Sequence, residues 1–555
     1  MGICRTPRIA SLVMTFLLLI AASGSAAAQA TKTSRAGDAS GTYRIAGTVV
    51  SKTDGHLLAN ARVTISDTKN SQKVEFVITS EDGKYDFNGL PASKYALTGR
   101  KRGFIAAAYD EHEQFSTAIV TGAGLDTEHL VLKLAPDAVV TGKVLDETGE
   151  PVRHATVTVY FDDHTQGVSR IHQFHATQTD DLGVYEITAL RPGTYFLSAS
   201  AKPWYAVHRF PEAANSEAKE RQSVDRSLDV AYPLTYYPDV AEADDALPIP
   251  IRGGERLQVD IHLNPVPALR LRFRVPGEGN GGFTVPQLEQ SAFDGATSAE
   301  VDGVRMVSPG IWELTGIPAG RYNIRTQGPG GGGQMNGVDL IKDGEEVDTS
   351  KAEALSNVKV RVEVPGESSV PKELGVGLRS GSRPLVGQMV DSKGETELQN
   401  IPAGSYELIV WSSRGRYSIA HVAAEGAEVS GHVLTLTPGA SSSVSLRLVA
   451  GRVEVRGIVK RSGKGFAGAM VVLVPKDPKG NRDLFRRDQS DLDGTFSLPG
   501  VIPGSYTVLA IENGWELDWS QPGVIAAYMK GGRTIEVGTR GTQMMLPEPV
   551  EVQSK

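Results

Sequence analysis

The chain has 555 residues, a formal net charge of −8 at pH 7 and a single cysteine. The acidic balance, with no dense cluster of lysine and arginine, argues against a nucleic acid partner. One cysteine excludes a disulfide framework and a cysteine-based zinc site, and the length suits several domains rather than one.

Residues 1–28 have the pattern of a secretory signal peptide. Arg5 and Arg8 precede an apolar run from Ile9 to Ile20, and a small-residue segment then offers a cleavage site after Ala28. The run is too short to span a bilayer comfortably, and no second run is long enough for a membrane helix. The cysteine lies before the run and would leave with the signal. We therefore expect an exported protein, periplasmic or extracellular, with no membrane span in the mature chain.

One pattern recurs five times along the chain, with a glycine 12 residues before a tyrosine. Apolar residues alternate after the glycine, a proline-containing turn follows, and the tyrosine opens the next segment, so each copy predicts a strand, a tight turn and a strand. We interpret the tyrosines as structural, because buried tyrosines at such corners brace β-sandwiches. They are Tyr95, Tyr195, Tyr322, Tyr406 and Tyr506.

A second pattern opens three of the repeats, at Ile45–Ile65, Val140–Val159 and Val455–Val474. It reads Gly-x-Val, a polar turn, then a small residue followed by Val-x-Val or a close variant. Together the two patterns resemble the carboxypeptidase regulatory-like domain, a transthyretin-like sandwich related to Cna B-type and starch-binding-like domains. The resemblance implies an all-β protein: a tandem array of five small antiparallel β-sandwich (prealbumin/Ig-like) domains after the signal peptide. In carboxypeptidases this module is a non-catalytic appendage, so the resemblance implies binding or scaffolding.

The spacing of the repeats predicts five domains. The second carries an aromatic insertion at 203–250, with a helix-compatible run from Glu212 to Leu228. The third and fourth are degenerate, because the polar turn after their opening strand is replaced. The predicted bounds are 43–135, 136–264, 266–350, 357–449 and 452–549.

The sequence contains no motif that indicates catalysis. The His-Glu-x-x-His, Gly-x-Ser-x-Gly and phosphate-loop patterns are all missing, so we expect no enzyme and no cofactor. His172 and His175 lie three apart, and on a strand they would point to opposite faces, which argues against a shared metal ion. Asp488, Asp491 and Asp493 resemble a calcium loop, but no acidic residue stands at its last position. We expect a polar turn with a solvated acidic edge and no metal site.

Three functions remain open: a scaffold of the cell envelope that binds surface proteins, a carbohydrate-binding protein, and a hydrolase with an unrecognised site. Carbohydrate binding requires exposed aromatic side chains, since sugars stack on them. The alternative for each is packing under a loop. Trp411 is expected in a core. The candidate ligand-binding aromatics are Trp515, Trp519, Trp204, Tyr205, Tyr236 and Tyr237.

Overall fold

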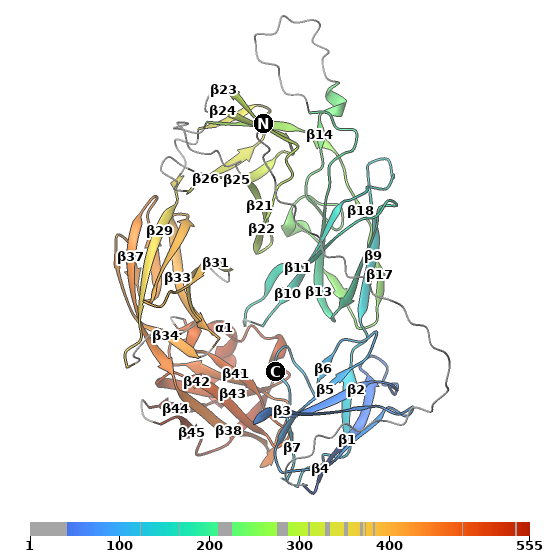
Figure 1. Ribbon diagram of the computed structural model, residues 1–555, viewed down its shortest axis with the longest axis vertical. Coiled ribbons are helices and arrows are strands. Elements are labelled where there is room, and N and C mark those ends of the chain that lie inside the picture. Colours follow the sequence, from blue (N-terminus) through green and yellow to red (C-terminus); the bar gives the residue numbers. More distant parts are fainter. Residues whose placement is uncertain are drawn as a thin grey trace, which may run out of the picture. The chain divides into compact units, whose positions relative to one another are not determined.

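The computed structural model describes residues 41–555 except 123, 166, 209–224, 275–286, 309–310, 328–332, 349–352, 367–369, 372, 381–382, 414, 480 and 539–540. The predicted signal peptide and most of the helix-compatible run at 212–228 lie outside these residues. Among the described helices, none has the length and apolar character needed to cross a membrane. The regular secondary structure of the described residues is almost entirely β-strand, which confirms the predicted fold class (Figure 1).

Module 1 is a sandwich of two sheets, defined by strands β1 to β8. The first strand pairs antiparallel with β4 and parallel with β8. In the other sheet, β2 lies between β3 and β5. The strands are β1 (Tyr43–Ser51), β2 (Arg62–Asp67), β3 (Asn70–Ile78), β4 (Lys84–Leu90), β5 (Lys94–Arg100), β6 (Ala107–Ala108), β7 (Ile119–Val120) and β8 (Leu130–Leu134).

Module 2 repeats this pairing with β9 as its first strand and β10 as the centre of its second sheet. Two short 3-10 helices, η1 (Arg226–Leu228) and η2 (Ala243–Asp245), lie in the insertion. The strands are β9 (Ala138–Leu145), β10 (Thr156–Asp163), β11 (Arg170–Gln178), β12 (Val184–Leu190), β13 (Gly193–Ser200), β14 (Val230–Ala231), β15 (Thr235–Tyr236), β16 (Ile249–Ile251), β17 (Arg256–Gln258), β18 (Ile261–His262) and β19 (Val266–Pro267), which pairs with β14.

Modules 3 and 4 keep the same pairing although their opening turns depart from the repeat. Their first strands, β20 and β29, still alternate buried and outward residues, and this alternation is what a sandwich strand needs. Module 3 contains β20 (Leu269–Arg274), β21 (Gln287–Ala292), β22 (Gly295–Ser298), β23 (Gly303–Ser308), β24 (Ile311–Ile317), β25 (Gly320–Gln327), β26 (Gly333–Leu340), β27 (Glu345–Asp348) and β28 (Glu353–Ala354). Module 4 contains β29 (Ser356–Glu363), β30 (Leu374–Ser380), β31 (Arg383–Met389), β32 (Glu395–Ile401), β33 (Gly404–Ser412), β34 (Arg416–Glu425), β35 (Glu428–Ser430), β36 (Val433–Leu436) and β37 (Ser441–Gly451).

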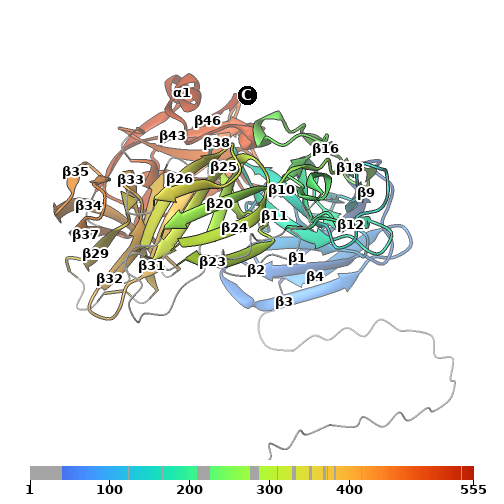
Figure 2. The same ribbon diagram turned by 90° about the horizontal axis from the view of Figure 1, so that it is seen from above.

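Module 5 joins its two layers through the last strand, which pairs parallel with β38 and with β43. A short α-helix, α1 (Pro522–Ile525), lies outside β43 and is flanked by η5 (Gly514–Glu516) and η6 (Ala526–Gly531) (Figure 2). The strands are β38 (Val453–Arg461), β39 (Lys464–Gly465), β40 (Met470–Pro475), β41 (Arg486–Gln489), β42 (Thr495–Val501), β43 (Gly504–Glu512), β44 (Arg533–Val537), β45 (Gln543–Met545) and β46 (Val550–Ser554), and η4 (Arg482–Leu484) precedes β41.

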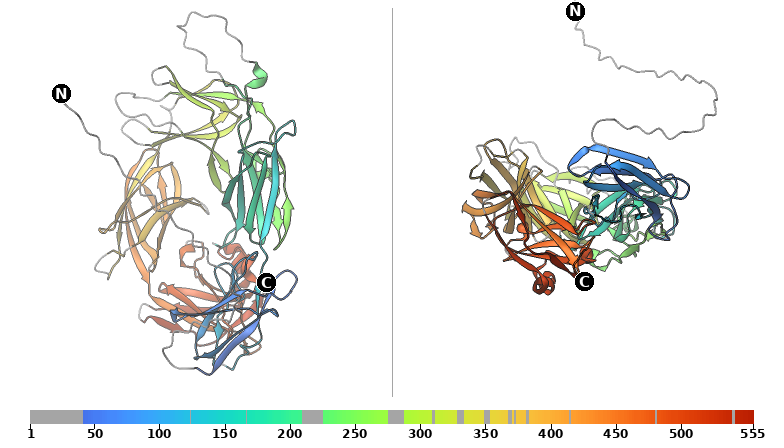
Figure 3. Two further views of the ribbon diagram at one scale, coloured as in Figure 1. Left: turned by 45° about the vertical axis from the view of Figure 1, so that its right-hand side comes forward. Right: turned by 90° about the horizontal axis from the view of Figure 1, so that it is seen from below.

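Each module has its own hydrophobic core, and the views in Figure 3 show strands throughout the coloured chain. The repeat tyrosines are buried in these cores, with exposed fractions of 6% or less. In all five, the hydroxyl donates to the backbone carbonyl four residues earlier, at 2.8 to 3.1 Å. This bond ties the second strand to the turn before it, and its repetition makes the five corners alike. The predicted domain boundaries stay a prediction.

Candidate interaction surfaces

Trp515 and Trp519, two of the predicted sugar-binding aromatics, are buried. Their exposed fractions are 7% and 9%. Both pack on the outer face of the β40–β43 layer, in a cluster that includes Met470 and Leu509. The segment between β43 and β44 folds back over this face and brings the indoles with it. The exposure that sugar stacking requires is therefore absent at both tryptophans.

The insertion aromatics divide between buried and exposed positions. Tyr236 is 1% exposed, because Phe293 of module 3 packs on it, with ring centroids 5.3 Å apart. Tyr237 is half-buried against the module 2 core, and the hydroxyl of Tyr205 donates to Glu147. These three side chains thus serve packing or hydrogen bonding.

Two tryptophans are exposed. Trp204 is 87% exposed and meets Tyr205 edge to face. Trp411 is 41% exposed, so the expectation that it lies in a core is wrong. It stands on β33 directly opposite Gly375 of β30, and it points away from the core that Leu408 enters.

Arg487 joins module 5 to module 1. Its side chain is 3% exposed and forms an ion pair with Glu113, in the segment between β6 and β7. The guanidinium also lies 4.8 Å from the ring centre of Phe115 and 4.7 Å from that of Trp519. Burial strengthens such charge and cation–π contacts, since water does not screen them.

Gln489, two residues further along β41, extends the same contact. Its side-chain amide donates to the backbone carbonyl of Asp110 at 2.6 Å and to the hydroxyl of Thr117 at 2.8 Å. Its carbonyl oxygen lies 3.1 Å from Nδ1 of His112, and that imidazole stacks on Trp515 with centroids 4.8 Å apart. Every polar atom of the buried amide is thus engaged by module 1.

The turn after β41 forms a third set of contacts between module 5 and module 1. Lys94 of β5 forms an ion pair with Asp491, and its ammonium donates to the hydroxyl of Thr495 at 2.6 Å. The Asp491 carboxylate also accepts the backbone N–H of Ala118 at 3.1 Å. Burial raises the pKa of Asp491, and burial raises that of Asp488 to about 7. The expected solvated acidic edge is therefore wrong, because module 1 covers it.

Module 2 reaches the same region of module 5. The backbone carbonyl of Gly167 accepts the N–H and the hydroxyl of Ser520, at 3.1 and 3.0 Å. His164 Nδ1 lies 3.1 Å from a carboxylate oxygen of Asp518. Segments around 110, 165, 487 and 518 thus meet in one interface, although they are far apart in sequence.

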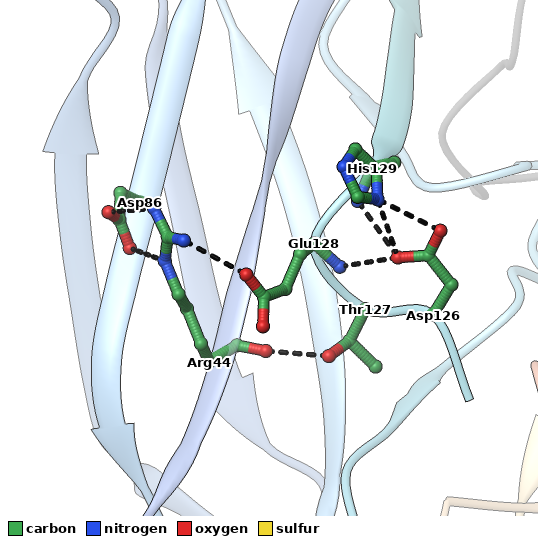
Figure 4. Close-up of polar contacts among 6 residues, drawn as sticks. All are labelled: Arg44, Asp86, Asp126, Thr127, Glu128 and His129. Atoms are coloured by element: carbon green, nitrogen blue, oxygen red, sulfur yellow. Dashed lines mark hydrogen bonds and ion pairs between the residues drawn. The ribbon is translucent and has the colours of Figure 1, made fainter. Parts of the chain in front are cut away.

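A cleft of about 720 Å³ beside this interface brings histidines and carboxylates together. Its lining includes Asp110, His112 and Glu113, and all three are already engaged by module 5 or by Thr117. At its rim, His129 pairs with Asp126 in an exposed polar cluster that also contains Arg44 (Figure 4). Asp110, His112 and Glu113 therefore contact module 5 rather than pointing free toward a substrate.

The described residues contain no group of three His, Cys, Asp or Glu placed to hold a metal ion. His172 and His175 lie on β11 opposite Phe161 and Val159 of β10, with a bulge between them. Because Phe161 and Val159 are two apart and share a face, both histidines lie on that face, and the expectation of opposite faces is wrong. Among the described residues, no third ligand completes a metal site at the histidine pair or at the acidic turn.

Comparison with known families identifies two segments. Residues 44–124 and 139–222 match the carboxypeptidase regulatory-like domain. No curated protein sequence matches the chain.

Among solved structures, the chain is similar to the Bacillus anthracis TIE protein, with 10% identity over 75% of both chains and a TM-score of 0.18. It is similar to a minor pilin of Streptococcus agalactiae at 14% identity, covering 41% of this chain and 97% of the pilin, with a TM-score of 0.21. Two B repeat units of the collagen-binding protein of Staphylococcus aureus align at 11% identity, over 74% of this chain and 99% of theirs, with a TM-score of 0.12.

Proposed function

We propose that this protein, whose first two modules are carboxypeptidase regulatory-like domains, is an exported, non-enzymatic scaffold of the cell envelope or its surroundings. Export rests on the signal pattern of residues 1–28. The non-enzymatic role rests on the missing catalytic motifs and on the accessory nature of this domain type. The scaffold presents several module surfaces at once to envelope or surface proteins.

The interface between modules 1 and 5 is the observation that carries the proposal. In a linear array each module contacts only its neighbours along the chain. Here Arg487 and Asp491 are buried against residues almost 400 positions earlier in the sequence. Buried ion pairs and satisfied amide bonds define one geometry, because a shifted arrangement would leave them unpaired. Such ties suit a protein that holds binding surfaces at fixed separations.

The distance between modules 1 and 5 tests this proposal. The only cysteine precedes the predicted cleavage site, so a spin-label pair can be introduced cleanly at Leu57→Cys and Met545→Cys, both exposed positions. Pulsed electron resonance on the mature chain should give one narrow distance distribution. It should broaden in the Arg487→Gln/Gln489→Ala variant, which loses ties to module 1.

A matched control is Arg461→Gln, which removes an ion pair to Glu512 inside module 5 and should leave the distribution unchanged. A broad distribution in the unmodified protein would refute the fixed arrangement. Export is tested separately, by sequencing the N-terminus of the protein recovered outside the cytoplasm. Gln29 is the expected first residue.

A further inference from the structure

Trp411 lies flat on a floor of three glycines. A Cβ atom added at Gly375 would stand 2.2 Å from Cε2 of the indole, and one at Gly387 would stand 2.5 Å from Cη2. At Gly377 the added atom would come within 3.1 Å of Cζ3. Contacts of 2.2 and 2.5 Å are not tolerated, so glycine at 375 and 387 lets the ring rest on the sheet. One face of the indole therefore covers the backbone, and the side chain remains 41% exposed.

A row of outward side chains continues from Trp411 along β33. Residues two apart share a face, so Ile409, Glu407 and Ser405 follow the indole over about 20 Å. Glu407 accepts two hydrogen bonds from Arg379 of β30, at 2.6 and 3.1 Å, and both side chains stay partly exposed. The surface thus passes from a flat aromatic ring to a hydrogen-bonding pair.

We propose that this row, the Trp411 face, binds a polysaccharide, with a sugar ring stacked on the indole and hydroxyls bound by Arg379 and Glu407. A sugar ring has an apolar C–H face and a polar hydroxyl edge. The indole of Trp411 suits the first, and the polar pair of Arg379 and Glu407 suits the second. Guanidinium and carboxylate groups suit hydroxyls, and Nη1 of Arg379 and Oε1 of Glu407 take no part in the two bonds between these side chains.

A protein partner fits this face less well. Tryptophans that dominate protein interfaces are enclosed in well-packed, desolvated pockets. Trp411 instead lies flat on the sheet, and its glycine floor leaves no room for it to sink further. The inference goes beyond the scaffold function and does not depend on it.

Co-sedimentation of the mature chain with insoluble chitin, cellulose, starch and purified peptidoglycan sacculi tests the proposal. We expect binding to at least one polymer, and Trp411→Ala should weaken it about tenfold. Gly387→Ala is the sharper variant, because the three atoms nearest the added methyl all belong to the indole, so the methyl should tilt the ring without removing it. It should weaken binding as well. Thermal unfolding checks that each variant is folded.

Trp204→Ala is the matched control, since it removes an exposed tryptophan from another module. It should bind as the unmodified protein does. No binding to any of the four polymers, or equal binding by Trp411→Ala, would overturn the proposal. Loss of binding in Trp204→Ala to the same extent would also overturn it, as would a dimer in solution that Trp411→Ala converts to monomer.

Discussion

The outer faces of modules 4 and 5 differ in what covers them. In module 5, the outward residues of β40 and β43, such as Met470 and Ile511, lie under Trp515 and Trp519. In module 4, the equivalent positions on β30 are Gly375 and Gly377, and a single tryptophan lies on them in contact with solvent.

The route that the chain takes after β43 and after β33 explains the difference. In module 5, 20 residues separate the end of β43 at Glu512 from the start of β44 at Arg533. They form η5, α1 and η6 and close over the sheet. In module 4, the equivalent connection from Ser412 to the start of β36 at Val433 also has 20 residues, but it forms β34, which pairs with β37 in the other sheet, and β35. Burial of a tryptophan here depends on the connection that follows it, not on its immediate neighbours in sequence.

The largest expected effect is at the covered face. Trp519→Ala should lower the free energy of unfolding by about 3–5 kcal/mol, because it leaves a cavity among buried apolar side chains. Chemical denaturation followed by circular dichroism measures it. A decrease in the free energy of unfolding of less than about 1 kcal/mol would mean that the segment between β43 and β44 contributes little to packing on this face.

Among the substitutions, the second largest loss of stability is expected at the buried ion pair between Arg487 and Glu113. Arg487→Met leaves Glu113 without its buried partner and should cost about 3 kcal/mol. The Arg487→Met/Glu113→Gln double variant should recover a large part of this loss, since neither residue then carries a charge. If the double variant is as unstable as the single one, packing by the guanidinium rather than its charge holds the interface.

Asp488, beside Arg487 on β41, gives this region a pH dependence. Its folded pKa of about 7 exceeds the ordinary value of 3.8, so the folded protein favours the neutral carboxyl. The neighbouring charges are Asp491 and Lys94. The stabilisation from the neutral carboxyl is complete below pH 4 and is lost as the pH rises to 7, at a cost of roughly 4 kcal/mol in the free energy of unfolding. Asp488→Asn should therefore flatten the stability profile between pH 4 and 7, and an unchanged slope would contradict the assignment.

The strand, turn and strand unit of each repeat could be predicted from the sequence, because the residues that indicate it are close together in the chain. The glycine, the alternating residues and Tyr506 with its counterparts lie within 15 residues of one another, and both strands and the turn follow from them. Modules 3 and 4 kept the sandwich because their opening strands preserve the alternation.

The interface between modules 1 and 5 could not be predicted. Arg487 and Gln489 share one face of a strand of only four residues. No pattern in the neighbouring sequence indicates that their partners lie more than 370 positions earlier in the chain. For Trp515 and Trp519 the sequence allowed either exposure or packing under a loop, and both indoles pack. The alternating pair Gly375 and Gly377 was the unused signal, since glycines within a strand mark a close approach.

The smallest effect on stability is expected at the open face. Trp411→Ala should change the free energy of unfolding by less than about 1 kcal/mol, because much of the indole stays in water and its removal leaves no enclosed cavity. Acrylamide quenching sharpens the contrast. In a Trp204→Phe/Trp312→Phe background, the accessible emission should come chiefly from Trp411, while Trp515 and Trp519 stay protected. A Trp411 variant as unstable as Trp519→Ala would show that the glycine floor and its tryptophan act as a core, and the distinction between the two faces would fail.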